Sequence, residues 1–138
     1  MLKMETTLSE CLDLAANSNT STEVLDQLSK HHNYLVRCCV AQNPNTSLKT
    51  LTHLSYDDRY VRMWVAQNPG TTPEILEVLK KDNESTVRAW VAAVPNTPIE
   101  ILKTLAHDKD KFVRYRVGNN KNTPETIRRI VKMNNGQK

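Results

Sequence analysis

The stretch VRMWVAQNPGTTPEIL, Val61 to Leu76, decides the fold, because the chain repeats it almost unchanged as VRAWVAAVPNTPIEIL, Val87 to Leu102. A Val-Arg pair recurs at four places, separated by steps of 25, 26 and 26 residues. Self-similarity at a period of about 20 to 50 residues is the mark of repeat architectures. We therefore interpret the chain as an array of four to five units. The pairs are Val36-Arg37, Val61-Arg62, Val87-Arg88 and Val113-Arg114.

Each unit has the pattern of two helices. After the Val-Arg pair, the apolar residues Val61, Val65 and Ala66 form a helical stripe that ends at an Asn-Pro dipeptide, because the residue before proline avoids the α region. A second helix follows, with leucines at i and i+3. The spacing of Thr20 to Glu23, Thr71 to Glu74 and Thr97 to Glu100 predicts a capping box at its start, and Pro98 and Pro124 are expected at the first helical position.

Helices of about 7 to 12 residues are marginal alone in water, so the units must stack and share a core. The sequence predicts an all-α protein, an α-solenoid of about five repeats of 25–26 residues that form one domain. We expect a degenerate N-terminal cap over residues 1–19, repeats over residues 20–122 and a C-terminal cap over residues 123–138.

The recurring pattern VR-x-x-VAQNP-x-T, followed by Glu and two leucines, resembles the leucine-rich repeat variant family and, more loosely, the HEAT-like α-solenoids. The resemblance covers about residues 14 to 131. It implies α-helices that alternate with short α or 3₁₀ helices in a right-handed superhelix. A founding member carries an iron-sulfur module built from N-terminal cysteines, but only Cys11 lies near this N-terminus. We therefore expect no cofactor.

Composition indicates where in the cell the protein is expected. No secretory signal or long apolar run occurs, and the three cysteines include two neighbours, Cys38 and Cys39, which is a poor basis for a disulfide framework. We therefore expect a soluble, cytoplasmic protein. The net charge is +4, but residues 100–138 hold 10 Lys/Arg against 4 Asp/Glu.

The most repeated charges are the four arginines of the Val-Arg pairs and the aspartates in the turns that precede three of them. They could form an anion-binding stripe. The favoured interpretation is a structural ladder in which arginine and aspartate alternate between repeats, because a residue that stacking requires must recur in every unit. The ladder is Arg37, Asp57, Arg62, Asp82, Arg88, Asp108 and Arg114.

A second column lies three residues after each valine, at Cys39, Trp64, Trp90 and Arg116. The tryptophans could be partly buried packing wedges, or they could belong to a binding face. A helical wheel places Cys38, Met63, Ala89 and Tyr115 furthest from the core, and a surface with Trp, Met and Tyr but little Lys or Glu has the composition of an interface centre. The predicted partner-binding residues are Met63, Trp64, Gln67, Trp90, Tyr115 and Arg116.

Basic residues gather near the C-terminus, where they could form a solvated face or bind the phosphates of a nucleic acid. The candidate contacts are Lys109, Lys111, Lys121, Arg128, Arg129 and Lys132.

Signals for catalysis or metal binding are weak. Cys38 and Cys39 lie near His31 and His32 without a third orienting group, no Cys or His pair has metal-ligand spacing, and only three glycines occur. We expect no enzyme activity and no metal. The predicted function is a non-catalytic module that binds a protein partner along the Val-Arg helices. The alternatives are nucleic-acid binding and, third, an enzyme that acts on DNA. We expect no membrane contact, and the oligomeric state is left open.

Overall fold

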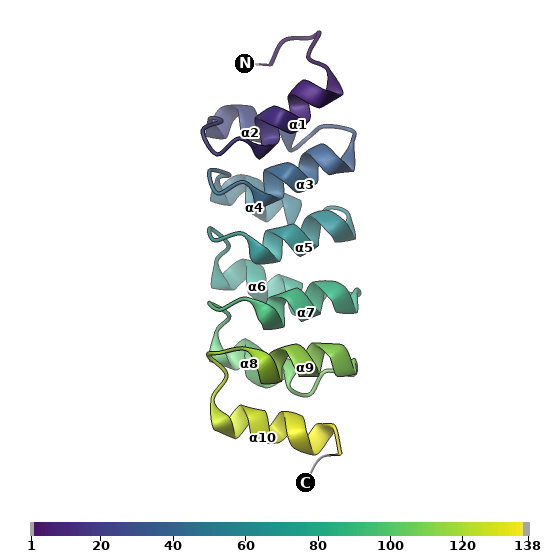
Figure 1. The fold of residues 1–138 in the computed structure, drawn as a ribbon, viewed down its shortest axis with the longest axis vertical. Coiled ribbons are helices and arrows are strands. Elements are labelled where there is room, and N and C mark those ends of the chain that lie inside the picture. Colours follow the sequence, from purple (N-terminus) through teal and green to yellow (C-terminus); the bar gives the residue numbers. More distant parts are fainter. Residues whose placement is uncertain (1, 137–138) are drawn as a thin grey trace. The chain divides into compact units, whose positions relative to one another are not determined.

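The computed structural model describes residues 2–136, and in this part of the chain it contains ten helices and no strand (Figure 1). The helices alternate between nine and seven residues, and the last has ten. The all-α repeat architecture predicted from the sequence is confirmed. The helices are α1 (Leu8–Ala16), α2 (Thr22–Leu28), α3 (Tyr34–Gln42), α4 (Leu48–Leu54), α5 (Arg59–Gln67), α6 (Pro73–Leu79), α7 (Ser85–Ala93), α8 (Ile99–Leu105), α9 (Lys111–Asn119) and α10 (Glu125–Asn134).

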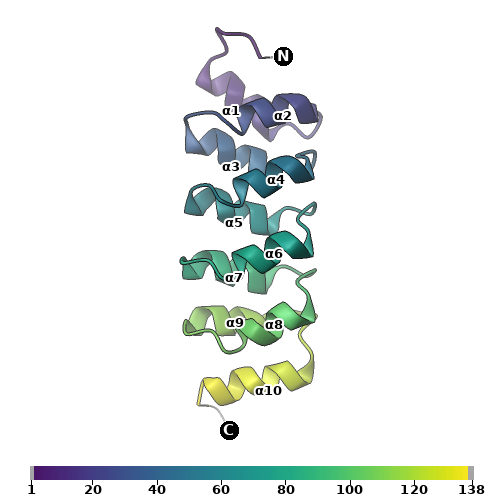
Figure 2. The ribbon, with the colours of Figure 1, turned by 180° about the vertical axis from the view of Figure 1, so that it is seen from behind.

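The chain forms two compact units, one up to Thr72 and the other from Pro73. In unit 1, the nine-residue helices α1, α3 and α5 pack side by side, and α2 and α4 pack behind them (Figures 1 and 2). In unit 2, α7 packs on α9, α9 packs on α10, and α6 and α8 lie in the second layer. The single domain over residues 1–138, its caps and the right-handed superhelix stay predictions.

The predicted apolar stripes form the core of both units. Val61, Val65 and Ala66 are at most 2% exposed, and the equivalent valines and alanines of α3 and α7 are fully buried. The leucine pairs of the seven-residue helices are also buried. Burying one such side chain contributes about 1.5–3 kcal/mol, so stacking supplies the stability that a helix of two turns lacks alone. The leucines are Leu25, Leu28, Leu51, Leu54, Leu76, Leu79, Leu102 and Leu105.

The nine-residue helices end where the Asn-Pro dipeptides predict. Asn43, Asn68 and Val94 are the C-cap residues of α3, α5 and α7, and all three have extended backbone angles. The next residue is proline in each case, which disfavours the α region for the residue before it. The second helix of every repeat is α-helical, and no 3₁₀ helix occurs among residues 2–136.

The predicted capping boxes are wrong. Each of the repeated threonines donates its hydroxyl to the carbonyl six residues earlier, at the end of the preceding helix, as Thr46 does to the Val40 carbonyl at 2.6 Å. The N-cap of α4 is the next residue, Ser47, whose hydroxyl accepts from the Thr50 amide. The same donation is made by Thr20, Thr71, Thr97 and Thr123.

The two prolines expected inside the helices also lie one position earlier. Pro98 and Pro124 are the N-cap residues of α8 and α10, whereas Pro73 is the first residue of α6. A true capping box exists at α1, which the sequence analysis missed: the Thr7 hydroxyl accepts from the Glu10 amide, and the Glu10 carboxylate accepts from the Thr7 amide.

Candidate binding surfaces

In unit 1 the arginine of the first Val-Arg pair joins two successive turns. Arg37 forms a forked ion pair with Asp57, in which Nε lies 3.0 Å from Oδ2 and Nη2 lies 3.0 Å from Oδ1. Its Nη1 donates to the carbonyls of His31 and His32 at 2.7 and 3.1 Å. One side chain therefore caps its own turn and holds the next one. Arg62 likewise caps the turn before its own helix, because its Nη1 donates to the Asp57 carbonyl at 2.6 Å.

Unit 2 repeats the arrangement with more complete burial. Arg88 Nε lies 2.8 Å from Asp108 Oδ2, and Arg88 Nη1 donates to the Asp82 carbonyl at 2.7 Å. The side chains of Arg88 and Asp108 are only 7% and 8% exposed. The hydrogen bonds that Arg88 donates to the Asp108 carboxylate raise the pKa of the Arg88 guanidinium. These contacts engage both guanidiniums inside the protein, which supports the structural ladder over the anion-binding stripe.

The last arginine of the series differs in its partner. Arg114 Nη1 donates to the Asp108 carbonyl at 2.6 Å, as in the other units, but Nε donates to the amide oxygen of Asn135 at 2.7 Å. A neutral amide thus occupies the place that an aspartate holds beside Arg37 and Arg88. The charge of Arg114 is therefore not balanced by a carboxylate among residues 2–136.

An asparagine column, which the sequence analysis did not recognise, binds successive repeats to each other. The Asn43 amide donates to the carbonyls of Ala15 and Asn17, both at 2.8 Å. In unit 2, Asn120 donates to the carbonyls of Ala92 and Val94 at 2.8 and 2.9 Å. The repeated Asn-Pro dipeptide was the available signal, but the helix-breaking role of proline explained it without any contact. Asn68 makes the same pair of bonds, to Ala41 and Asn43.

The predicted outward face of the Val-Arg helices is mostly covered. Cys38 and Ala89, which the helical wheel placed furthest from the core, are only 6% and 2% exposed, so this expectation is wrong for both. Met63, Trp64 and Trp90 are half-buried. Neighbouring helices of the same unit cover part of this surface: α1 and α5 pack on α3, and α9 packs on α7. Gln67 is also half-buried, and its amide donates to the Met63 carbonyl at 3.1 Å.

Arg116 is half-buried between two aromatic rings. Its guanidinium carbon lies 5.0 Å from the ring centroids of both Trp90 and Phe112, within the range of a cation–π contact. Its Nε is buried and has no hydrogen-bond partner. The structure therefore brings together Trp90 and Arg116 from the predicted binding face, but in a packing contact within unit 2.

Two exposed tyrosines of unit 1 lie at the first turns of α3 and α5. Tyr34, Leu35 and Tyr60 are 42%, 49% and 44% exposed. The rings of Tyr34 and Tyr60 lie 5.8 Å apart, and the Arg59 guanidinium lies 4.9 Å from the Tyr60 ring. We call Tyr34, Leu35, Arg59 and Tyr60 the tyrosine patch. All four residues lie one or two places before a Val-Arg pair, at positions that no sequence-based prediction included.

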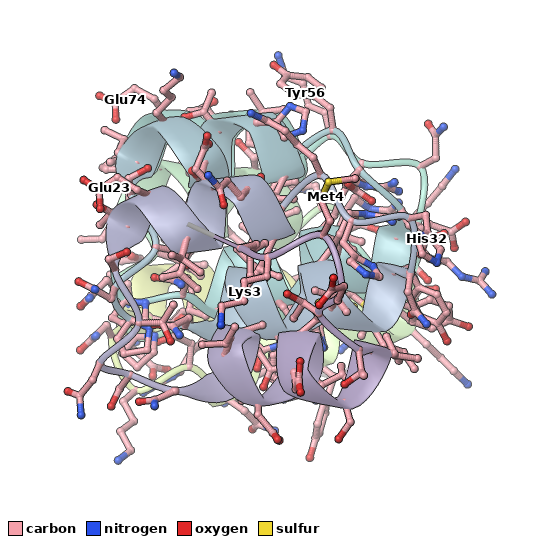
Figure 3. The ribbon with its side chains drawn as sticks, turned by 90° about the horizontal axis from the view of Figure 1, so that it is seen from above. Lys3, Met4, Glu23, His32, Tyr56 and Glu74 are labelled. Carbon is pink, nitrogen blue, oxygen red and sulfur yellow. The ribbon has the colours of Figure 1, made fainter. Side chains whose placement is uncertain are left out.

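Figure 3 labels His32 and Tyr56, which lie in the turns that lead into α3 and α5. His32, in the turn that leads into α3, lies at one side of the unit, and Glu23, in the first turn of α2, lies at the opposite side. Tyr56, in the turn before α5, points outward and is 72% exposed. The turns that lead into α3 and α5 thus each carry a ring that is open to solvent, His32 and Tyr56.

Unit 2 carries its exposed aromatic residues on α9. Phe112 and Tyr115 are 47% and 57% exposed, and their rings are nearly parallel, with 15° between the planes and 6.2 Å between the centroids. With Lys111, Arg114 and Asn135 they line a shallow pocket. We call Lys111, Phe112, Arg114, Tyr115 and Arg116 the basic aromatic patch.

The structure separates the other predicted nucleic-acid contacts by their surroundings. Arg128 is half-buried and donates to the Asn120 carbonyl at 3.2 Å, and the exposed Arg129 lies 3.8 Å from Glu125. Both arginines therefore have partners inside unit 2. The lysines of the set, Lys109, Lys111, Lys121 and Lys132, are exposed.

The cysteines offer little nucleophilic character. Burial raises the pKa of the Cys38 thiol to about 11, and burial also raises the pKa of Cys39. The thiolate that attacks or binds a metal is thus scarce near neutral pH. No group of three His, Cys, Asp or Glu residues within residues 2–136 could hold a metal ion, and no helix there is long and apolar enough to cross a membrane.

Comparison with known families agrees with this architecture. The model of the Leucine Rich Repeat Variant domain matches residues 39–94, and the model of the Leucine rich repeat variant matches residues 86–110. Together they span residues 39–110, just over half of the chain. Neither curated proteins nor solved structures give a match.

Proposed function

The chain belongs to the leucine-rich repeat variant family, and on that premise we propose that it is a non-catalytic module that binds a protein partner through the tyrosine patch of unit 1. Repeats of this family typically serve structure and interaction. Stacked helical repeats present extended surfaces of the kind that binding uses. We place the protein in the cytoplasm, where its three free cysteines fit a reducing compartment.

The observation that carries this proposal is the exposure of neighbouring rings on two successive helices. Tyr34 and Tyr60 expose 42% and 44% of their surface, although each could have been a small polar residue at no cost to the core. Tyrosine and arginine are enriched among the residues that contribute most to protein interfaces, because they combine a large apolar area with a polar end. Arg59 extends this area, since its Nη2 lies 3.1 Å from the Tyr60 hydroxyl oxygen.

The proposal moves the protein interface from the middle of the Val-Arg helices to their first turns. Met63, Trp64 and Trp90 are half-buried, so they can offer a partner only part of their surface. Arg116 is engaged by Trp90 and Phe112. An anchor residue has to reach into a pocket of the partner, which the exposed tyrosines can do without any rearrangement of the repeat.

Site-directed photo-crosslinking tests the proposal. A photoreactive phenylalanine analogue in place of Tyr60 should crosslink the partner in cells, whereas the same group in place of Leu48 should not. Leu48 is a suitable control because it is 51% exposed and lies on α4, in the other layer of unit 1.

The crosslinked partner is then purified, and its affinity is measured by calorimetry. Tyr60→Ala should weaken binding by about 30-fold or more, which corresponds to an anchor contribution of about 2 kcal/mol. Leu48→Ala should leave the affinity unchanged. If Tyr60→Ala binds as tightly as the unaltered protein, the tyrosine patch is not the interface.

A further inference from the structure

We propose that the basic aromatic patch of unit 2 binds single-stranded nucleic acid, DNA and RNA alike, with bases stacked on Phe112 and Tyr115 and phosphates held by Lys111 and Arg114. This binding site is independent of the protein interface proposed for unit 1. Its residues differ from the basic set that the sequence pointed to, of which only Lys111 belongs to the patch.

The charge of the patch is the first argument. Arg37 and Arg88 are each neutralised by an aspartate, but the equivalent Arg114 is bonded to the neutral Asn135. No carboxylate within residues 2–136 pairs with Lys111, Arg114 or Arg116. Lys111 and Arg114 on α9 thus keep their charge available for an anion.

The acidic residues nearest in sequence form no ion pair with Lys111, Arg114 or Arg116 within residues 2–136, because other groups of the fold engage their carboxylates. Asp108 is paired with Arg88. Asp110 is the N-cap of α9, where its carboxylate accepts from the Phe112 and Val113 amides at 2.8 and 3.3 Å. These backbone hydrogen bonds, the one from Phe112 foremost, lower the pKa of Asp110.

The rings are the second argument, and they decide between a nucleic acid and an acidic protein segment. Phe112 and Tyr115 expose about half of their surface as two nearly parallel rings, one helical turn apart. Every base has a flat π-face, so exposed rings beside a track of cations bind single strands with little sequence preference. A duplex keeps its bases stacked inside, so it cannot use the rings.

Arg116 also supports the Phe112 ring on one side. Its guanidinium carbon lies 5.0 Å from the ring centroids of both Phe112 and Trp90, so the Phe112 ring is in contact with a group that the rest of unit 2 holds in place. A ring that is held from one side in this way loses little freedom when a base stacks on it. The pocket lined by Lys111, Phe112, Arg114, Tyr115 and Asn135 is therefore in place before a ligand arrives.

Fluorescence anisotropy with labelled oligothymidylate and oligouridylate of about 20 nucleotides tests the proposal on the full chain. We expect micromolar binding of both at low salt, and a log-log salt dependence of about −0.7 for each neutralised phosphate of a single strand. Tyr115→Ala and Phe112→Ala should each weaken binding by about 5- to 150-fold, the range found for loss of one stacked base. Lys111→Gln should reduce the steepness of the salt dependence by about 0.7.

Two variants of α8 serve as matched controls, since this helix lies in the other layer of unit 2. Ile99 is 52% exposed and Lys103 is exposed, so Ile99→Ala and Lys103→Gln change the same kinds of group elsewhere. Neither should alter binding. Circular dichroism checks folding first, and if Phe112→Ala fails to fold, the more exposed Tyr115 decides the role of the rings.

Several outcomes would overturn the proposal. One is the absence of binding tighter than about 10⁻⁴ M at low salt, the weak edge of non-specific association. Equal losses in the α8 controls would show that only the overall charge matters. Equal affinity for duplex DNA would exclude stacking, and equal affinity for polyglutamate would assign the patch to an acidic protein segment. None of these results bears on Tyr60, so the two proposals fail separately.

Discussion

The two units share one scaffold but expose different chemistry. Residues 1–72 contain six Lys/Arg and seven Asp/Glu, whereas residues 73–138 contain thirteen and eight. Just before the Val-Arg pair, α5 of unit 1 exposes Tyr60 next to its own Arg59. On α9 of unit 2, Phe112 is exposed next to Lys111 and near Arg114, neither of which pairs with a carboxylate among residues 2–136. Positions that stacking requires recur in both units. Function therefore has to be sought at the positions that do not recur.

The ladder gives the largest difference in energy between the units. The side chains of Arg88 and Asp108 are 7% and 8% exposed, whereas those of Arg37 and Asp57 are 18% and 15% exposed. Breaking a well-buried ion pair leaves a charge that neither water nor protein solvates. We expect Arg88→Ala to cost about 3–5 kcal/mol of stability in unit 2, and Arg37→Ala to cost about 1–3 kcal/mol in unit 1.

Urea unfolding measures both losses, because each unit contains one tryptophan. A Trp90→Phe background leaves Trp64 to report on unit 1, and a Trp64→Phe background leaves Trp90 to report on unit 2. Lys103→Ala is the control and should change stability by less than about 0.5 kcal/mol, as is usual for unconstrained surface positions. Equal losses for the two arginines would mean that their difference in burial carries no energetic weight.

The asparagine column should show no difference in stability between the units, because its hydrogen bonds are equivalent in both. Asn43→Ala and Asn120→Ala each strand two carbonyls of the preceding repeat. A buried acceptor that loses its donor costs about 1–3 kcal/mol, so we expect similar losses in the two units. The same single-tryptophan unfolding curves measure them. Asn96, which is exposed, provides the control, and a loss as large in Asn96→Ala would contradict the assignment.

The sequence predicted the elements whose cause is local. Valine and leucine stripes, and helices that stop before proline, follow from spacing within one repeat. The threonines were misread because a hydroxyl both donates and accepts. The spacing of Thr97 to Glu100 satisfies a capping box, yet the Val91 carbonyl at the end of the preceding helix takes the hydroxyl instead. Asn43 was missed for a related reason, since its partners lie 26 and 28 residues earlier.

The candidate surfaces were harder to predict than the fold. A helical wheel places Cys38 outward because it counts angles from the buried Val36, and it contains no information about the helices on either side. In unit 1, α1 and α5 pack on either side of α3, so that Cys38 in the middle of α3 is covered while Tyr34 and Leu35 in its first turn stay exposed. The sequence also did not predict that Arg114 is bonded to an amide and not to a carboxylate, because its partner Asn135 lies 21 residues further along the chain.

The smallest expected effect concerns acid stability, and it compares one carboxylate from each unit. The hydroxyl of Thr50, 3.0 Å away, is the main cause that lowers the pKa of Asp26 in unit 1, with Lys30 as a second donor. The Phe112 amide does the same for Asp110 in unit 2. A carboxylate whose pKa is lower in the folded state adds stability that is present above its ordinary pKa, 3.8, and is lost as the pH falls through the folded value.

We therefore expect both units to lose stability as the pH falls below about 4, since the ionised forms of Asp26 and Asp110 are the ones that accept these hydrogen bonds. Asp26→Asn should flatten this loss in the curve that Trp64 reports and leave the Trp90 curve unchanged, and Asp110→Asn should do the reverse. Both carboxylates are near the surface, so the loss of stability is small. In about 1 M salt the charge attraction of Lys30 should be screened, whereas the part of the loss that comes from the hydrogen bonds should remain. If Asp110→Asn instead makes unit 2 more sensitive to acid, the ionised carboxylate of Asp110 does not stabilise α9 through its hydrogen bonds to the Phe112 and Val113 amides.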